Sequence, residues 1–403
     1  METHLFIIWN RAENWRDKII EDINKKFKIR KVYEISWQFH LFSNNLARLY
    51  GPKLPPNSPK EIRIGRGPFT LIIVEDKNPI YRSRQIRGNR TEIVNTNMFD
   101  SKTIYRKWTK KETNIPDLIH ATNTVKESNR DLTLLLGANM NQYIPKADTL
   151  NWKGAIEKLS LDIVGSTGWE NLESLLKVLN ATTKYVVLRN FEDIPHKYIS
   201  KEHGDIDLLV DNYDDACSII NAKPLTDLPY RVLNHVDING ILTPFDLRHV
   251  GDNYYDINWE TDILDTRVWN ASGFFKPDPE HHFYSLMYHA YIQKSVIAPD
   301  YKIKLNCLAN HIGVESIDKS VLDTFMVHNN YSYIKPIDKS VKYIPEIMNN
   351  KKVLEILSQS TTYKIYYKMY KIFYPHQNTV WFKLLRPLNY IFKKWFIKNL
   401  IQP

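Results

Sequence analysis

The residues best suited to chemistry are Asp205 and Asp207, an Asp-x-Asp pair directly before the apolar run 208–210. Alternate residues of a strand face the same side, so the pair presents two carboxylates to one site. A third acid, Asp246, lies in the strand-like segment 244–248, which we expect to be an antiparallel neighbour. Carboxylates this close repel each other unless a divalent cation relieves the repulsion. Three carboxylates around Mg²⁺ or Mn²⁺ would form a phosphoryl-transfer site, with all three acids as metal ligands and catalytic residues.

A purely structural interpretation of the Asp-x-Asp pair competes with the metal site. Aspartate is common at solvated strand ends and turns, so the pair alone does not establish a site. Asp252 and Asp256 also compete with Asp246 for the position of third acid.

The Asp-x-Asp motif, the third acid and the later helix-like run 280–289 together resemble the polymerase-β-like nucleotidyltransferase superfamily. The resemblance covers about residues 180–300 and looks closest to the branch of surface-glycan and capsule gene clusters, including enzymes of the LicD and fukutin kind. It implies a mixed sheet with helices and a Mg²⁺-dependent transferase that moves a nucleotidyl or sugar/polyol-phosphate group. It maps Asp205, Asp207 and Asp246 onto the metal-binding acids. His289 is expected to pack or hydrogen-bond inside this unit.

The segment 187–191 departs from the family pattern. Most members place a Gly-Ser or Gly-Gly at a helix start between the first strand and Asp-x-Asp, where backbone amides hold a triphosphate. This chain reads Val-Leu-Arg-Asn-Phe there. Arg189 is the candidate to bind phosphate instead, through its planar fork of donors.

The amino-terminal third offers a second group of candidate phosphate or substrate ligands. Lys60 and Arg66 lie in an arginine-rich stretch in which Gly65 and Gly67 would let the backbone approach an anion. His120 stands just before a helix that begins near Thr124 and is a candidate acid/base or anion ligand. The alternative is a solvated basic loop.

The order of elements predicts an α/β plus α+β chain. Strands near 5–9, 28–36 and 69–75 alternate with helices, which predicts a small, partly parallel α/β domain over 1–140. Residues 76–118 look rich in loops, and 137–152 reads as a linker. A nucleotidyltransferase-like domain should span 150–300, with a hairpin turn at Asn239-Gly240. A helical extension, 301–360, and a tail, 361–403, follow.

The charge balance separates the tail from the body. The 403 residues carry a formal charge of +10, but residues 361–403 contain eight Lys and Arg and no acid. Aromatic residues and lysines alternate over 380–401, which favours an amphipathic helix on an anionic membrane surface. The alternatives are a docked helical pair and nucleic acid, and the nearly neutral body argues against nucleic acid.

Two cysteines and no long apolar run indicate a cytoplasmic protein, peripheral at the inner face of the cell membrane. Its expected partners are a nucleotide or nucleotide-activated donor and a glycan or lipid-linked glycan acceptor in surface polysaccharide synthesis. Two other functions stay open. Asp-x-Asp also chelates Mn²⁺ in glycosyltransferases that use nucleotide sugars, and the missing glycine pair suits a non-catalytic binding or regulatory protein with the same fold.

Overall fold

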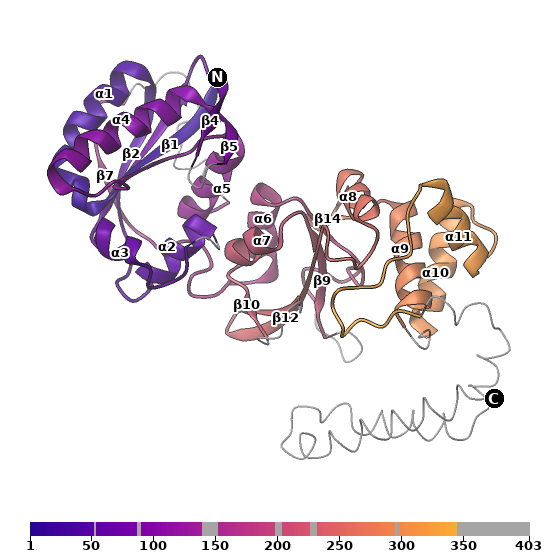
Figure 1. Ribbon diagram of the computed structural model, residues 1–403. Coiled ribbons are helices and arrows are strands. Elements are labelled where there is room, and N and C mark those ends of the chain that lie inside the picture. The colour runs from indigo at the N-terminus through magenta and orange to yellow at the C-terminus, as the bar shows by residue number, and fades with distance from the viewer. Residues whose placement is uncertain are drawn as a thin grey trace.

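The computed structural model describes residues 1–51, 54–86, 90–138, 152–197, 204–225, 232–294, 297 and 299–344. Within these ranges the chain is a mixed α/β protein with two five-stranded sheets in separate parts of the molecule (Figure 1). No helix in the same ranges is long and apolar enough to cross a bilayer. The predicted tail, 361–403, and the end of the predicted extension lie outside the described residues.

The first sheet has the strand order β6-β1-β3-β2-β7. Its members are β1 (Glu2–Ile8), β2 (Lys28–Ser36), β3 (Phe69–Asp76), β6 (Ile119–Ala121) and β7 (Glu157–Ser160). Neighbours among the first four are antiparallel, while β7 runs parallel to β2. The order β6-β1-β3-β2 is that of the split βαβ, ferredoxin-like arrangement. The alternation of strands and helices suggested more parallel pairing, because it does not reveal that β3 inserts between β1 and β2.

Helices cover this sheet so thoroughly that every residue of β3 is buried. The 3₁₀ turn η1 (Asn10–Trp15) and α1 (Arg16–Lys26) connect β1 to β2, and α4 (Thr96–Thr113) connects β5 to β6. Phe6 of β1 packs edge-on against Phe27 and Tyr105 at 5.7 and 5.8 Å between ring centres. A third helix, α5 (Val125–Leu136), also packs along β1.

The expectation of a loop-rich segment over 76–118 was wrong. This stretch forms a hairpin, β4 (Tyr81–Gln85) with β5 (Thr91–Asn95), followed by the 18-residue helix α4. The Asn95 side chain caps α4 by accepting hydrogen bonds from the backbone N–H groups of Asn97 and Met98. The helix was hard to recognise because only a few of its residues are apolar and buried, and its cap is one asparagine among many polar residues.

The first unit also extends further along the chain than expected. Strand β7 pairs with β2 from Tyr33↔Glu157 to Ser36↔Ser160. The predicted boundary at 140–150 is therefore too early, and most of the predicted linker lies outside the described residues. A four-residue edge strand with one residue in four half-buried carries too little periodicity to be recognised in sequence.

The second sheet has the order β10-β11-β12-β9-β8. Its members are β8 (Tyr185–Val187), β9 (Ile206–Val210), β10 (Lys223–Pro224), β11 (Leu233–Ile238) and β12 (Ile241–His249). Strands β9 and β12 are parallel, and the other neighbours are antiparallel. The predicted hairpin turn between β11 and β12 is confirmed, with positive φ at Asn239 and Gly240. Two helices, α6 (Leu172–Thr182) and α7 (Tyr213–Ile220), pack against each other beside this sheet.

The third part is helical and has a core rich in aromatic rings. It contains α8 (Ile257–Asp265), the hairpin β13 (Val268–Asn270) with β14 (Phe274–Lys276), α9 (Pro279–Ile292), α10 (Pro299–Ile312) and α11 (Lys319–His328). Trp259 stacks on Tyr331, and Tyr284 stacks on Phe325. After α11, residues 331–344 run back toward the second sheet (Figure 1). We call this stretch the return segment.

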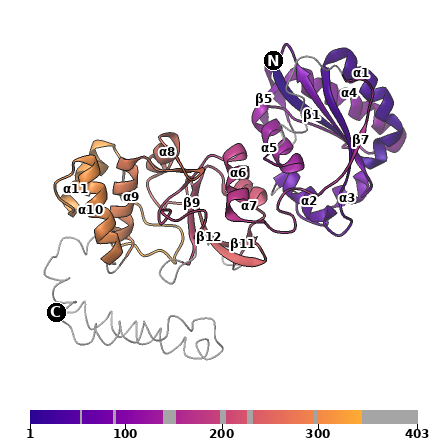
Figure 2. The ribbon, with the colours of Figure 1, turned by 180° about the vertical axis from the view of Figure 1, so that it is seen from behind.

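A buried arginine joins the first unit to the second. Arg48 lies in α2 (Phe42–Tyr50), which is followed by α3 (Pro59–Ile64). Its guanidinium donates to the carbonyl oxygens of Ser218 and Ile219 at 2.9 and 2.7 Å. These carbonyls belong to the last turn of α7, where no intrahelical donor remains. Arg48 therefore caps a helix of the neighbouring unit, and Figure 2 shows α2 and α7 at this junction from behind.

Burial of His282 in α9 predicts an acid-sensitive fold. The side chain packs against Phe191, and burial lowers the pKa of His282 to about 4. The folded pKa lies below the unfolded value of about 6.5, so the stabilisation is present above pH 6.5 and is lost as the pH falls toward 4. The shift corresponds to at most about 3 kcal/mol.

Chemical denaturation at pH 7 and pH 5 tests this. We expect His282→Phe to lose clearly less stability between the two pH values than the unsubstituted protein. His311→Phe, at an exposed histidine of α10, is the matched control and should keep the full loss. An equal loss in all three proteins would contradict the prediction.

Candidate functional site

The three predicted acids lie together at one end of the second sheet. Asp207 of β9 and Asp246 of β12 are direct partners in the parallel pairing, and Asp205 immediately precedes β9. One carboxylate oxygen from each residue lies within 4.8 Å of the other two. The predicted antiparallel pairing of these strands was wrong. The parallel register still places the acids side by side, because it aligns Asp246 with Asp207.

The two rival acids have structural partners of their own. Asp256 caps α8 by accepting from the backbone N–H of Asn258, and it also accepts from that of Ser332. Asp252 accepts from the backbone N–H of Tyr254 at 2.8 Å. Neither belongs to the close cluster formed by Asp205, Asp207 and Asp246, which we call the acid triad.

Asp207 forms a buried ion pair with Arg189, which follows β8. One Nη donates to the Asp207 carboxylate at 2.5 Å, and the two side chains are 7% and 4% exposed. The other Nη is buried and has no hydrogen-bond partner among the described residues. Burial raises the pKa of Asp207 to about 7 against the lowering effect of Arg189, and the other two acids of the triad add to the rise. Burial is thus the main reason why a charged carboxylate is costly at Asp207, and the neighbouring acids add to that cost.

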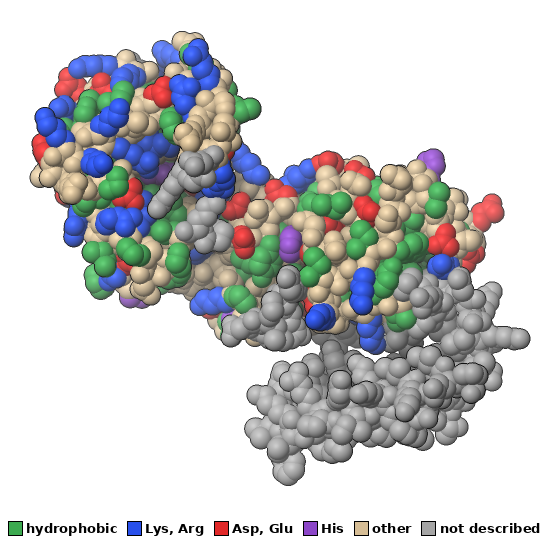
Figure 3. All heavy atoms as spheres, viewed as in Figure 1, with side chains coloured by type: hydrophobic (Ala, Val, Ile, Leu, Met, Phe, Trp, Pro, Cys, Tyr) green, Lys and Arg blue, Asp and Glu red, His purple; other side chains and the backbone are tan. Residues whose placement is uncertain are grey.

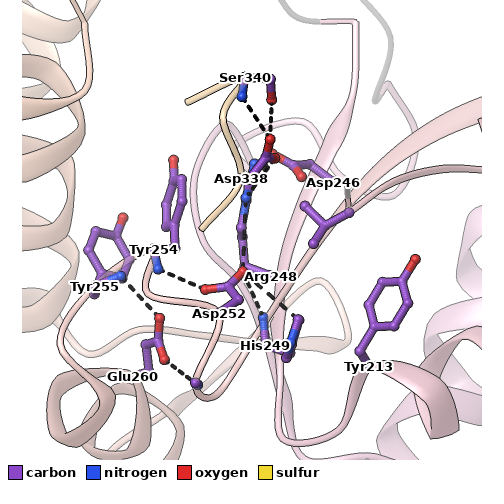
Figure 4. Close-up of polar contacts among 12 residues, drawn as sticks. Tyr213, Asp246, Arg248, His249, Asp252, Tyr254, Tyr255, Glu260, Asp338 and Ser340 are labelled. Atoms are coloured by element: carbon purple, nitrogen blue, oxygen red, sulfur yellow. Dashed lines mark hydrogen bonds and ion pairs between the residues drawn. The ribbon is translucent and has the colours of Figure 1, made fainter. Parts of the chain in front are cut away.

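Asp246 is held by Arg248, two residues further along β12 (Figure 4). The Arg248 guanidinium donates to one Asp246 oxygen from Nη2 at 2.9 Å and from Nε at 3.2 Å. Its Nη1 donates to Asp338 of the return segment at 3.2 Å. Asp338 also accepts from the backbone N–H and the hydroxyl of Ser340. The second Asp246 oxygen is buried without a partner in the described part of the chain.

Tyr254 lies between the two arginines. Its ring lies 4.3 Å from the Arg248 guanidinium and 5.7 Å from that of Arg189. Its hydroxyl and Nδ1 of His289 form a hydrogen bond of 2.9 Å, so the expected packing role of His289 is confirmed. Burial lowers the pKa of His289 well below its ordinary value. The hydrogen bond holds the Tyr254 ring between Arg189 and Arg248.

Sequence reasoning missed Lys294, which lies just after α9. Its side chain is exposed, and its charge interacts with Arg189 and with all three acids of the triad. No signal in the sequence identified it, because a single lysine after a helix is common. That its charge reaches the triad depends on the packing of α9, which brings residues far apart in the sequence together.

The other predicted phosphate ligands lie in the first unit and have partners there. Lys60 and Arg66 belong to α3 and the turn after it, where their partners are Asp117 at 3.3 Å and Glu61 at 2.5 Å. His120 lies on β6 and contacts Asp131 at 3.1 Å. The structure does not bring any of these three residues to the acid triad.

The glycines of Gly65-Arg66-Gly67 have a packing function. A Cβ at Gly67 would lie 2.3 Å from the Asn10 side chain, and one at Gly65 would lie 2.8 Å from it. Gly65 also has φ of +82°, which other residues rarely adopt. The glycines therefore let this turn approach Asn10, a sufficient reason for them without an anion.

A second group of metal-ligating residue types, His120, Glu127 and Asp131, also lies within 4.8 Å. Its oxygens already accept hydrogen bonds. Glu127 accepts from the backbone N–H of Asn123 at 2.5 Å, and Asp131 accepts from Arg130 at 2.9 Å. The Thr124 side chain caps α5 by accepting from the Glu127 backbone N–H, which confirms the predicted start of this helix near Thr124. These contacts give each member of the group a structural partner, and those of Glu127 hold the start of α5.

Comparison with known proteins leaves the geometry as the main guide to function: no protein-family model matches the chain, and no curated protein matches it significantly.

Proposed function

We propose that this protein is a divalent-metal-dependent transferase of the polymerase-β-like nucleotidyltransferase type. It moves a nucleotidyl or sugar/polyol-phosphate group from an activated donor to an acceptor hydroxyl. The observation that carries the proposal is the in-register pairing of Asp207 with Asp246 on adjacent parallel strands, with Asp205 beside them.

The order of elements supports the proposal. A helix, α6, precedes the short strand β8, and β9 then carries the Asp-x-Asp motif. Helix α7 follows, and β12 brings the third acid parallel to β9. This matches the order that the resemblance implies, in which two acids stand at one strand end and the third on a later strand.

The residues of the acid triad fit a hard divalent cation. Such cations prefer carboxylate oxygens, and the triad offers one from each of three residues. One oxygen of Asp246 is buried without a hydrogen-bond partner, and a cation bound at the triad would provide one. Mg²⁺ or Mn²⁺ held by Asp205, Asp207 and Asp246 would supply charge neutralisation to the phosphoryl oxygens during transfer.

The remaining charged residues divide into two roles. Arg189 and Arg248 fix the orientation of Asp207 and Asp246 through buried ion pairs, and neither guanidinium is exposed enough to be the main contact for substrate. Lys294 is exposed beside the triad, so we assign it the contact with the donor phosphates. It replaces Arg189 as the candidate for the role that backbone amides fill in most of the superfamily.

The biological setting also stays a proposal. The resemblance to the branch found in surface-glycan clusters makes a nucleotide-activated donor and a glycan or lipid-linked glycan acceptor the first pair to test. Association with the inner membrane surface would depend on residues 380–401, which lie outside the described residues.

Calorimetric titration tests the metal site and the donor class together. Mg²⁺ and Mn²⁺ are titrated into the full chain, with and without CTP, UTP, CDP-alditols and UDP-sugars. We expect metal binding that strengthens the binding of one nucleotide class, and Asp205→Asn should weaken the metal affinity at least about tenfold. Asp205 suits this test because it has no hydrogen bond or ion pair with another described residue.

Asp214→Asn is the matched control, since it makes the same change at an exposed position of α7. It should bind metal and nucleotide like the unsubstituted protein. Absence of metal binding by well-folded protein would refute the proposal and favour a non-catalytic role. Metal-dependent binding restricted to UDP-sugars would favour a glycosyltransferase.

A further inference from the structure

A cluster of cationic side chains in the first unit has too few acidic partners. It lies at the end of the first sheet where β1 stops and β6 begins. We call it the cationic cluster and define it as Lys60 and Arg63 of α3, Arg106 of α4 and Asp117, which precedes β6.

Three positive charges in this cluster share one carboxylate. Asp117 accepts from Lys60 at 3.3 Å and from Arg63 at 3.0 Å. Arg106 interacts with Asp117 only through its charge, because its Nε donates to the carbonyl oxygen of Ile119 at 2.7 Å. No described residue accepts from its two Nη groups. The cluster therefore has an excess of two positive charges and a guanidinium edge with unused donors.

Aromatic rings form one wall of the cluster. The Lys60 ammonium lies 4.5 Å from the centre of the Tyr50 ring, and that ring meets His120 edge-on at 5.5 Å. The Tyr50 hydroxyl accepts from Nε1 of Trp9 at 3.2 Å, which leaves its own hydrogen for another acceptor. The wall thus adds a hydroxyl donor to the cationic donors.

Burial is graded across the cluster. Lys60 is 8% exposed and lies at its base, whereas the Arg63 side chain is 40% exposed and lies at its rim. Burial, together with the charges of Arg106 and Arg63, lowers the pKa of Lys60 to about 8 in spite of Asp117. Lys and Arg side chains are frequent on the face of the first unit shown in Figure 3. A small anion can therefore approach from the rim and relieve the repulsion at the base.

We propose that the cationic cluster binds a phosphate group, either inorganic phosphate or the phosphate of a small phosphate monoester. The dianion matches the excess of two positive charges, and its oxygens match the donors of Lys60, Arg63 and Arg106. Tyr50 and His120 border the same site. This binding site is distinct from the acid triad and does not depend on the transferase activity.

The test is calorimetric titration of inorganic phosphate and of a sugar phosphate into the full, metal-free chain. We expect binding in the millimolar range or tighter, and at least about tenfold weaker binding by Lys60→Met and by Arg106→Met. If the substitution of Lys60 or Arg106 impairs folding, Arg63→Met at the exposed rim tests the site instead, and it should also weaken phosphate binding. Thermal melting of each variant without ligand checks that it is folded.

Two controls separate this site from other sources of affinity. Arg84→Met removes the same charge from an exposed pair with Asp100 and should leave phosphate binding within about twofold. Lys294→Met removes the lysine that we assign to the donor phosphates of the metal-loaded acid triad, so it should leave phosphate binding unchanged in this metal-free titration. Loss of binding only in Lys294→Met would overturn the proposal, as would no binding to the unsubstituted protein. If sulfate and chloride bound as tightly as phosphate, the site would hold an adventitious ion only.

Discussion

Asp207→Asn is expected to lose metal binding and about 3–5 kcal/mol of folding free energy at once. Asp207 is the only described residue that pairs with the Arg189 guanidinium, and both side chains are more than nine-tenths buried. Its removal leaves a buried positive charge uncompensated, in addition to deleting a carboxylate of the acid triad. Denaturant unfolding and metal titration of the same preparation measure the two losses.

A double variant separates these effects. Asp207→Asn combined with Arg189→Met removes both charges, so most of the lost stability should return while metal binding stays absent. Asp205→Asn is the opposite control, since it should lose metal affinity and keep its stability. The interpretation would be wrong if Asp207→Asn were as stable as the unsubstituted protein, or if the double variant were no more stable than the single one.

Arg248→Met is expected to produce the second large effect, about 3–5 kcal/mol of destabilisation. Arg248 is 4% exposed and contacts Asp246 at 2.9 Å and Asp338 at 3.2 Å. Without the arginine, these carboxylates remain buried close together with no cation between them (Figure 4). The return segment, which carries Asp338, should then detach more readily from the second sheet.

Denaturant unfolding measures the stability, and limited proteolysis with mass spectrometry measures cleavage within 331–344. We expect faster cleavage in Arg248→Met. Asp338→Asn should have a smaller effect, about 1–3 kcal/mol, because Arg248 keeps Asp246. Arg84→Met, which breaks an exposed pair, should change stability by less than about 1 kcal/mol. Unchanged proteolysis of Arg248→Met would show that the return segment is held by other contacts.

Local patterns predicted the elements that have local causes. The buried strands β1, β3 and β9 each contain a short apolar run, and the turn at Asn239-Gly240 needs positive φ that these two residues tolerate. The predicted helix start near Thr124 also has a local cause, because the Thr124 side chain accepts from the backbone N–H three residues further on. Helix α4 was missed because its apolar periodicity is weak, although Asn95 caps it.

In the candidate site, too, local sequence patterns predicted some features and the tertiary structure decided the others. The Asp-x-Asp spacing by itself placed Asp205 and Asp207 at one strand end, since residues two apart in a strand share a face. Only the tertiary structure decided that β12 lies parallel to β9, which aligns Asp246 with Asp207 across 39 positions of sequence. It also decided that Arg189 pairs with Asp207 and that Asp338 reaches Arg248. Such contacts depend on how whole elements pack against each other. Contacts between elements far apart in the sequence produce no periodic sequence pattern, so they could not be predicted.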